Sequence, residues 1–321
     1  MAEESSPTGL RDRVGLVVAG ADSRAVVERI VAAEAAGVPR IWMTQGAAAP
    51  DTMSIFAAAA VRTTTIGLGT AIVPTYPRHP ITLAQQALTI ADLAPGRLRL
   101  GVGPSHRPII EGVYGLSLDA PMAHLREYVT IVRDLLHAGQ SEHQGEFYRV
   151  RATLPRPSGV PILISALRAG AFQLSGEISD GALSWLCPPA YLLGTALPAL
   201  RAGADSAGRP APPLVAHIPV ALSTDRAAVA VAARKLLSGY ARLPFYAGMF
   251  ADAGFAVAPD GSVPDALIDS LVVSGDEAAI TNRLRELLDQ GLDELLIMPV
   301  PIADETAERE RLARLVGRLA G

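Results

Sequence analysis

The chain has 321 residues, of which 50% are hydrophobic and 19% are charged, and its formal net charge at pH 7 is −4. A chain of this length hides about three quarters of its unfolded surface when it folds, so a large core is available. The small negative charge, without any basic block, argues against nucleic acid as a partner. No apolar run approaches the ~20 residues that cross a membrane, and the polar stretch 1–13 is not expected to be a signal peptide.

Few side chains of the reactive types are present. The single cysteine, Cys187, excludes an internal disulfide and fits a reducing cytoplasm. With no evident base near it in the sequence, it is expected to be a buried or rim cysteine rather than a nucleophile. The six histidines lack a metal-ligand spacing, so no metal site is expected. Two of them, His124 and His137, fall on a predicted helix, where we expect them on the solvated side.

Eight apolar runs of strand length alternate with helical patterns along the chain. The strands are expected within residues 14–19, 40–44, 66–73, 97–103, 161–165, 180–185, 214–222 and 294–298. The helices are expected within residues 22–37, 51–61, 80–95, 121–138, 169–176, 189–204, 225–238, 276–290 and 305–319. In addition, residues 104–120 have the character of a long loop, and residues 141–151 that of a short hairpin with Gln144 and Gly145 at its turn.

This alternation predicts an α/β fold, a (β/α)8 TIM barrel that forms a single domain over residues 1–321. The competing architecture, an open doubly wound sheet, would need a GxGxxG turn after its first strand, and residues 19–22 do not supply one. The repeat breaks after the seventh strand. Residues 240–273, with several prolines and glycines, are too many for a plain connector and are expected to be a lid or an insertion.

In a TIM barrel the chemistry lies at the C-terminal ends of the strands. His106 follows the fourth strand, and its ordinary pKa near 6.5 suits proton transfer; a structural or exposed histidine fits the pattern equally well. Residues 165–170 are a strand end that runs into a helix N-terminus, where free N–H groups bind anions and Arg168 could add donors. The alternative there is an ordinary turn with a surface arginine.

Two glycines, Gly67 and Gly69, lie inside the third predicted strand. Glycine weakens a strand and commonly marks a bulge or a close approach of backbone or ligand. The small residues 69–72 therefore indicate either a bulge that meets a ligand at the barrel mouth or tight packing of the barrel. The residues alone thus predict a barrel with an anion-binding turn and a mouth built for a flat ligand.

Several motifs together resemble the bacterial luciferase-like family of flavin- and deazaflavin-dependent oxidoreductases. They are residues 33–38 (AEAAGV), 66–70 (IGLGT), 76–80 (YPRHP), 84–87 (AQQA), 95–103 (PGRLRLGVG) and 179–182 (SDGA). Residues 74–80 and the pair Ser105–His106 are most similar to the coenzyme F420-dependent branch. The resemblance covers nearly the whole chain and implies a TIM barrel with an insertion near strand seven, often as a dimer.

The resemblance also implies how a cofactor would lie. A non-proline cis peptide at Ala71–Ile72 would form a bulge against the middle of a tricyclic ring, leaving one face open for hydride transfer at C5 of a deazaflavin. The side-chain phosphate would lie on N–H groups near residues 166–168. The cofactor-contacting residues expected on this basis are Thr44, Thr70, Ala71, Ile72, Gly103, Ser165, Ala166, Leu167 and Arg168, and the expected catalytic residue is His106.

Two departures from the family pattern bear on the reaction. Relatives that oxidise sugar phosphates have an Asp-His pair after strand two and a Glu after strand four, where this chain has Thr44–Gln45 and His106. The missing carboxylate argues against the oxidation of sugar phosphates or simple alcohols. The family's Gly-Gly pair at the phosphate turn is Leu167–Arg168 here, and Arg168 would compensate by charge.

The favoured hypothesis is a cytoplasmic, homodimeric oxidoreductase that passes a hydride between coenzyme F420 and a small organic substrate, such as an activated alkene or imine. Residues 240–273 would cover the site and select the substrate. One alternative is an FMN-dependent monooxygenase of the same fold, and another is a non-catalytic barrel that binds flavin or deazaflavin. Nucleic acid, membrane and metal are not expected as partners. The sequence does not identify the substrate.

Overall fold

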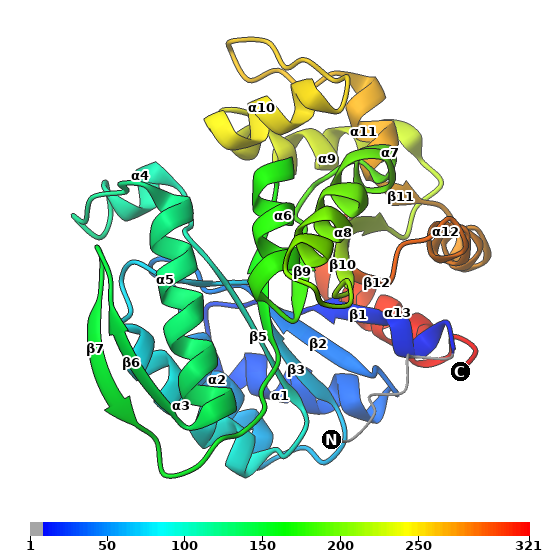
Figure 1. The fold of residues 1–321 in the computed structure, drawn as a ribbon. Helices are drawn as coiled ribbons and strands as arrows, with labels where there is room; N and C mark the ends of the chain where they lie inside the picture. Colours follow the sequence, from blue (N-terminus) through cyan, green and yellow to red (C-terminus); the bar gives the residue numbers. More distant parts are fainter. Residues whose placement is uncertain (1–8) are drawn as a thin grey trace.

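The structure, a computed structural model, describes residues 9–321. Most of the polar stretch 1–13, for which no signal peptide is expected, lies outside these residues. Eight parallel strands pair in a closed circle (Figure 1), which confirms the predicted TIM barrel. In order around the barrel they are β1 (Val14–Val17), β2 (Arg40–Met43), β3 (Gly67–Thr70), β5 (Leu98–Gly103), β8 (Ile162–Ser165), β9 (Gly181–Leu183), β10 (Leu214–Ala221) and β12 (Glu294–Pro299).

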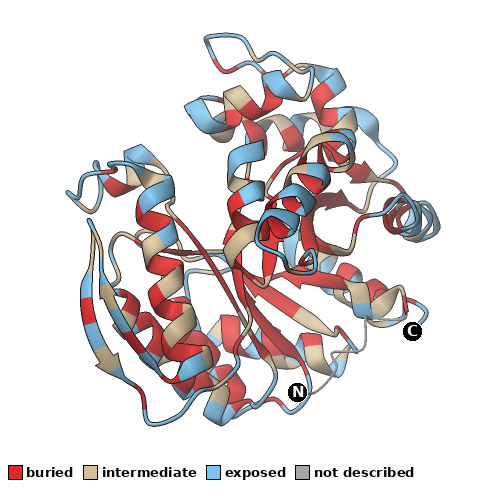
Figure 2. Ribbon diagram, in the orientation of Figure 1, coloured by how far each residue is buried: buried red, intermediate tan, exposed pale blue. Residues whose placement is uncertain are grey.

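Helices surround the barrel, with their buried faces toward the strands (Figure 2). They are α1 (Ser23–Ala35), α2 (Thr52–Ala60), α3 (Pro80–Leu93), α5 (Pro121–Arg133) with η2 (Asp134–Ala138), α6 (Ala169–Ile178), α7 (Pro189–Tyr191) with η3 (Leu192–Ala196), α8 (Leu197–Ser206), α9 (Arg226–Ala241), α12 (Glu277–Asp289) and α13 (Glu305–Gly317). Asp22 and Asp51 cap α1 and α2, because their carboxylates accept N–H groups from the first turns of these helices.

Trp42 fills the inside of the barrel, and two glycines make room for it. A Cβ on Gly15 would lie 2.4 Å from the indole, and a Cβ on Gly69 would lie 2.3 Å from it. The guanidinium carbon of Arg99 lies 5.7 Å from the indole centroid, and Arg99 pairs with Glu294 at 2.6 Å in a largely buried contact. Gly69 therefore serves the packing of the barrel, one of the two roles that its sequence context allows.

The predicted strand 66–73 is interrupted. It ends as β3 at Thr70, and β4 (Val73–Pro74) pairs with β5 on its own. Between them the Ala71–Ile72 peptide is cis, as the resemblance implies. Thr70 bridges the interruption, because its buried hydroxyl donates to the Gly101 carbonyl at 2.7 Å and accepts the Gly101 N–H at 2.8 Å. A side chain thus satisfies the backbone groups of the neighbouring strand.

The predicted hairpin forms, but its turn is longer than predicted. Strands β6 (Gln140–Gln144) and β7 (Arg149–Thr153) pair antiparallel, and the turn is residues 145–148 rather than Gln144 and Gly145. The Glu127 carboxylate accepts three N–H groups of this turn. Because Glu127 lies on α5, a contact distant in sequence decides the turn, and the local pattern does not contain it.

The expected long loop and the expected lid or insertion both contain helices. Residues 104–120 include α4 (Arg107–Ile110), and residues 240–273 include α10 (Pro244–Asp252) and α11 (Asp265–Leu271) before β11 (Val273–Ser274) pairs with β10. In Figure 1, α10 and α11 lie together with α9 at the top of the view. Two prolines of the insertion, Pro244 and Pro264, stand at helix starts, where a missing N–H does no harm, and Pro259 lies in the turn between the two helices.

His124 is only 4% exposed, so the prediction that it lies on the solvated side of its helix is wrong. It stacks on Tyr76 with a centroid distance of 3.8 Å, and its Nε2 lies 2.9 Å from the Tyr148 hydroxyl, because the hairpin turn packs on that side of α5.

Cys187 is buried as expected, and burial raises its pKa to about 12. Among residues 9–321 we find neither a helix long and apolar enough to cross a membrane nor a cluster of His, Cys, Asp and Glu able to hold a metal ion.

Candidate active site

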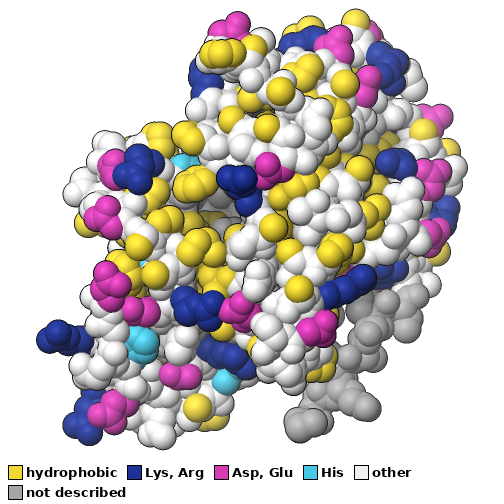
Figure 3. Space-filling view, turned by 45° about the horizontal axis from the view of Figure 1, so that its top comes forward, with side chains coloured by type: hydrophobic (Ala, Val, Ile, Leu, Met, Phe, Trp, Pro, Cys, Tyr) yellow, Lys and Arg dark blue, Asp and Glu magenta, His cyan; other side chains and the backbone are white. Residues whose placement is uncertain are grey.

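A cavity of about 1100 Å³ opens at the C-terminal ends of the barrel strands. Its walls come from the strand ends, the loop after β5, the first half of α5, one side of α6 along most of its length, and the insertion. Figure 3 shows hydrophobic side chains gathered around a hollow on this face, with basic and acidic side chains near its border. The cavity lies where TIM-barrel enzymes carry their chemistry.

Ala71 and Ile72 form a ridge in the cavity wall, and the end of β2 holds this ridge in place. The Thr44 hydroxyl donates to the Ala71 carbonyl at 2.7 Å, and the Gln45 N–H donates to the Ile72 carbonyl at 3.1 Å. The Ala71 N–H donates to the Met43 carbonyl at 2.9 Å. Since both carbonyls of the ridge and one of its N–H groups are bonded, its position is well defined.

Two of the predicted contact residues, Thr70 and Gly103, lie behind the wall rather than in it. Thr70 is fully buried and engaged with Gly101, as described above. A Cβ on Gly103 would lie 2.0 Å from the Ser165 hydroxyl and 3.4 Å from the Ile72 side chain. Gly103 therefore allows the side chains of Ser165 and Ile72, which do line the cavity, to lie where they do.

His106 lines the inner end of the cavity and has a free polar atom. Its Nδ1 is buried and makes no hydrogen bond within the described chain, and its ring centroid lies 5.4 Å from that of Tyr246. Burial lowers the pKa of His106 below its ordinary value near 6.5. The imidazole is therefore neutral at pH 7 and able to donate or accept one hydrogen bond inside the cavity.

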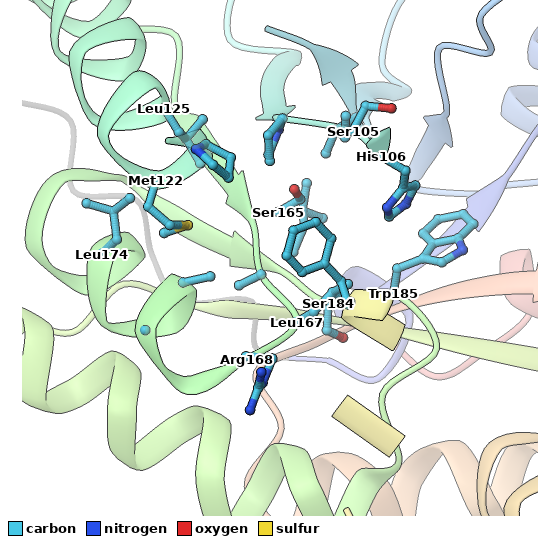
Figure 4. Close-up of a pocket in the computed structure, with 18 of the residues that line it drawn as sticks. Ser105, His106, Met122, Leu125, Ser165, Leu167, Arg168, Leu174, Ser184 and Trp185 are labelled. Carbon is cyan, nitrogen blue, oxygen red and sulfur yellow. The ribbon is translucent and has the colours of Figure 1, made fainter. Parts of the chain in front are cut away.

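Trp185 lines the same end of the cavity (Figure 4), and a second histidine supports it from behind. The ring of His217 stacks on the indole with a centroid distance of 3.7 Å and an interplanar angle of 23°. His217 Nδ1 accepts the Leu186 N–H at 3.2 Å, and burial lowers the pKa of His217 to about 3. A neutral, fixed imidazole thus holds Trp185 at the cavity wall.

Residues 165–168 connect β8 to the N-terminus of α6 and line the middle of the cavity. Within residues 9–321, no side chain caps this helix start, so its first N–H groups are available to a ligand. Arg168 is exposed, and its Nε donates to the Asp252 carboxylate on α10 at 2.9 Å. The turn that was predicted to bind an anion is therefore joined to the insertion by an ion pair.

The outer end of the cavity runs between α5 and α6. Met122, Leu125 and Leu174 give it an apolar floor (Figure 4), and Arg126 pairs with Glu177 across it. The sequence offers no local signal for this end, because its residues come from two helices that are separated by the hairpin. The same holds for Tyr240 and Tyr246 of the insertion, which line the inner end.

The structure brings together eight of the ten predicted site residues as cavity lining; the exceptions are Thr70 and Gly103. The sequence did not predict that His217 supports Trp185. A signal was present, because His217 is a polar residue in a strand that is otherwise apolar and buried. The chain is thus a TIM barrel whose apolar cavity, with a free histidine at one end and an uncapped helix start in its middle, has the chemistry for an extended ligand with a flat part.

The luciferase-like monooxygenase family model matches residues 8–294, so this chain belongs to that family. The chain is 35% identical over 195 residues to the F420-dependent glucose-6-phosphate dehydrogenase of Nakamurella multipartita, a match that covers 58% of this chain and 57% of that one. It is 25% identical over 306 residues to the 5,10-methylenetetrahydromethanopterin reductase of Methanolobus tindarius, which covers 89% and 92% of the two chains.

A solved structure has the same fold. The coenzyme F420-dependent tetrahydromethanopterin reductase from Methanopyrus kandleri superposes with a TM-score of 0.76, covering 96% of this chain and 97% of that chain at 22% identity. At this identity the likeness concerns the fold. It agrees with the closed barrel and its surrounding helices.

Proposed function

We propose that this protein is an oxidoreductase that transfers a hydride between the deazaflavin coenzyme F420 and a small organic substrate. The observation that carries the proposal is the joining, in one cavity, of an apolar inner end beside His106 and the uncapped N-terminus of α6. Membership of the luciferase-like family supports it, as do the F420-dependent relative and structural neighbour.

The residues of the cavity fit such a cofactor. A volume of about 1100 Å³ exceeds that of a typical small-molecule pocket, roughly 300–1000 Å³, so a ring cofactor and a substrate have room together. Gly170 lines the cavity, and a Cβ added there would meet no atom within 4 Å. The backbone at the start of α6 is therefore open to an anionic group.

In this proposal Thr44 and Gln45 hold the ridge of Ala71 and Ile72 against one face of the cofactor ring. Ser165, the Leu167 N–H with the first N–H groups of α6, and the Arg168 guanidinium hold its phosphate. The Ala166 N–H does not take part, because it donates to the Leu183 carbonyl at 2.8 Å. Thr70 and Gly103 shape the wall from behind.

Bound coenzyme F420 supplies a two-electron hydride donor or acceptor at C5. His106 holds or delivers a proton at a heteroatom of the substrate, a role for which a neutral imidazole is suited. Tyr240 and Tyr246, with the rest of residues 240–273, exclude water from the inner end. The chain itself thus contributes orientation, a dry site and one proton-handling group.

We further propose that residues 1–321 act as one domain, as a homodimer in the cytoplasm, without nucleic acid or membrane partners. The family resemblance and the net charge of −4 support this view, and the single cysteine fits a reducing compartment. Sedimentation velocity tests the assembly. A monomer at micromolar concentration would contradict the dimer and leave the cofactor proposal intact.

Titration of the purified chain with coenzyme F420, followed by quenching of the deazaflavin fluorescence, tests the proposed function. We expect tight, saturable binding and a clear preference over FMN in a parallel titration. Absence of F420 binding overturns the proposal. Preferential FMN binding would select the flavin monooxygenase, and binding without turnover of any substrate would select the non-catalytic barrel.

A further inference from the structure

The charged side chains that line the cavity gather at its outer end and at the edge of the insertion. They are Arg126, Glu127, Arg168, Glu177 and Asp252. Each guanidinium already pairs with a carboxylate of the same lining, Arg126 with Glu177 and Arg168 with Asp252. With three carboxylates against two guanidiniums, the lining has a net charge of −1, so the cavity as a whole does not attract a second anion.

The inner end has a different character. We define the inner chamber as Ile72, His106, Trp185, Tyr240 and Tyr246, all of them described residues, and none of them is cationic at pH 7. Its rings contact one another: the centroid of Tyr246 lies 5.4 Å from that of His106 and 4.9 Å from that of Tyr240. The chamber is therefore a group of aromatic surfaces with two buried nitrogens that have no hydrogen-bond partner among the described residues, Nδ1 of His106 and Nε1 of Trp185.

This chemistry discriminates between substrates. A phosphate dianion in the inner chamber would lose its water and find no positive partner, which is a large penalty. A flat uncharged ring, in contrast, buries apolar area against Trp185 and the tyrosines and stacks favourably on them. A carbonyl oxygen on such a ring would meet the free Nδ1 of His106 in its N–H tautomer.

We propose, resting on the proposed F420 function, that the substrate is an uncharged, ring-bearing conjugated carbonyl compound, and that phosphorylated sugars are excluded. One hydride, taken from the reduced deazaflavin, adds to the β-carbon of the C=C bond. The π electrons move to the carbonyl oxygen, where His106 donates a hydrogen bond, and the α-carbon takes a proton from solvent when the inner end opens for product release. The substrate gains two electrons and two hydrogens, and the oxidised deazaflavin releases one proton to solvent.

The test uses the F420-loaded protein and a pair of probes that share one ring and differ by a carboxylate remote from the reacting bond. These are 2-cyclohexen-1-one and the same ring carrying a carboxylate at C5, with glucose 6-phosphate as a third ligand. Binding is followed by the emission of Trp185; the second tryptophan, Trp42, is buried inside the barrel. Turnover is followed by the oxidation of reduced F420 for the ring compounds and by the reduction of oxidised F420 for the sugar phosphate.

We expect the neutral ring to bind at least tenfold more tightly than its carboxylate analogue and to be reduced, and glucose 6-phosphate to give neither binding nor F420 reduction. Equal or tighter binding of either anion overturns the inference, and so does the absence of binding by the neutral ring up to roughly 10 mM. Failure of F420 to load contradicts the proposed function instead, so the two failures are distinguishable.

Two variants sharpen the test. Tyr240→Arg places a cation in the inner chamber and is expected to reduce the preference for the neutral ring over its carboxylate analogue at least threefold. Val231→Ala, on the exposed face of α9, is the matched control and is expected to leave the preference unchanged. An unchanged preference in Tyr240→Arg, with F420 affinity retained, would show that the charge of the chamber does not select the substrate and would overturn the inference.

Discussion

The two ends of the cavity differ in how they are built. The inner chamber is held by buried, fixed contacts, such as the stack of His217 on Trp185 and the hydrogen bond from Thr44 to the Ala71 carbonyl. The outer end is held by ion pairs whose side chains are partly exposed, as in the contact of Arg168 with Asp252, where the exposed fractions are 56% and 42%. Buried aromatic contacts keep a geometry, whereas exposed ion pairs exchange partners readily.

This difference matches two demands on one ligand site. Hydride transfer requires the reacting atoms to be positioned closely, which a rigid apolar end provides. An anionic tail requires donors that can turn toward it, which the outer end provides through Arg168 and the start of α6. The contrast predicts that substitutions at the inner end change turnover and substrate affinity, and that substitutions at the outer end change mainly cofactor affinity.

The largest effect is expected at His106. Replacing it with alanine should lower turnover about 100-fold or more, because a positioned hydrogen-bond donor to a developing oxyanion typically contributes about 10²–10³-fold. F420 affinity should stay within about twofold, since His106 lies at the substrate end. Single-turnover kinetics with 2-cyclohexen-1-one measures the first quantity and fluorescence titration the second. Full turnover by His106→Ala would show that His106 has no catalytic role.

A smaller effect is expected at Trp185. Replacing it with alanine removes a ring surface from the inner chamber, and burial of a large apolar side chain contributes about 1.5–3 kcal/mol, so the KM for the neutral ring should rise roughly 10–100-fold. Trp185→Phe, which keeps a ring, should restore most of the affinity. Steady-state kinetics checks both variants. A change confined to kcat would indicate that Trp185 does not bind the substrate.

The free energy of unfolding should depend on pH through His217, the residue behind Trp185. The pKa of His217 is lowered to about 3 by burial in the folded protein, so between pH 3 and 6.5 only the unfolded chain binds the proton. The stabilising contribution is complete above pH 6.5 and is lost as the pH falls, at about 1.4 kcal/mol per pH unit.

Urea unfolding of the wild type and of His217→Gln at pH 6.5, 5.5 and 4.5 isolates this contribution from that of the carboxylates. Glutamine keeps an acceptor for the Leu186 N–H but does not titrate, so the free energy of unfolding should fall less steeply in the variant. Parallel slopes in the two proteins would mean that His217 is not held neutral.

The smallest effect is expected at the outer end. Arg168→Ala should weaken F420 binding about three- to tenfold at low salt, because an exposed charged hydrogen bond contributes little beyond 1 kcal/mol. Asp252→Asn should strengthen it a few-fold, since the carboxylate no longer competes for Arg168. Both effects should shrink at high salt. If both variants weakened or both strengthened F420 binding, Asp252 would not compete with the cofactor for Arg168.

Much of this architecture could be predicted from the sequence. Apolar runs of strand length and helical spacing are local properties, so all eight barrel strands and the helices α1 and α2 appear where expected. The rule that barrel chemistry lies at strand ends then selects His106 and residues 165–168 from the sequence alone. The motifs around residues 66–103 pointed to the family to which the chain belongs.

Only the tertiary structure decided the features that depend on contacts between distant segments. Glu127 on α5 sets the hairpin turn, the hairpin buries His124, and Arg168 meets Asp252 across 84 residues of sequence. The stack of His217 on Trp185 and the aromatic walls from residues 240–273 also require the chain to be folded. A local pattern reports the preference of a segment for strand or helix, and it carries no information on which side chains the closure of the barrel brings together.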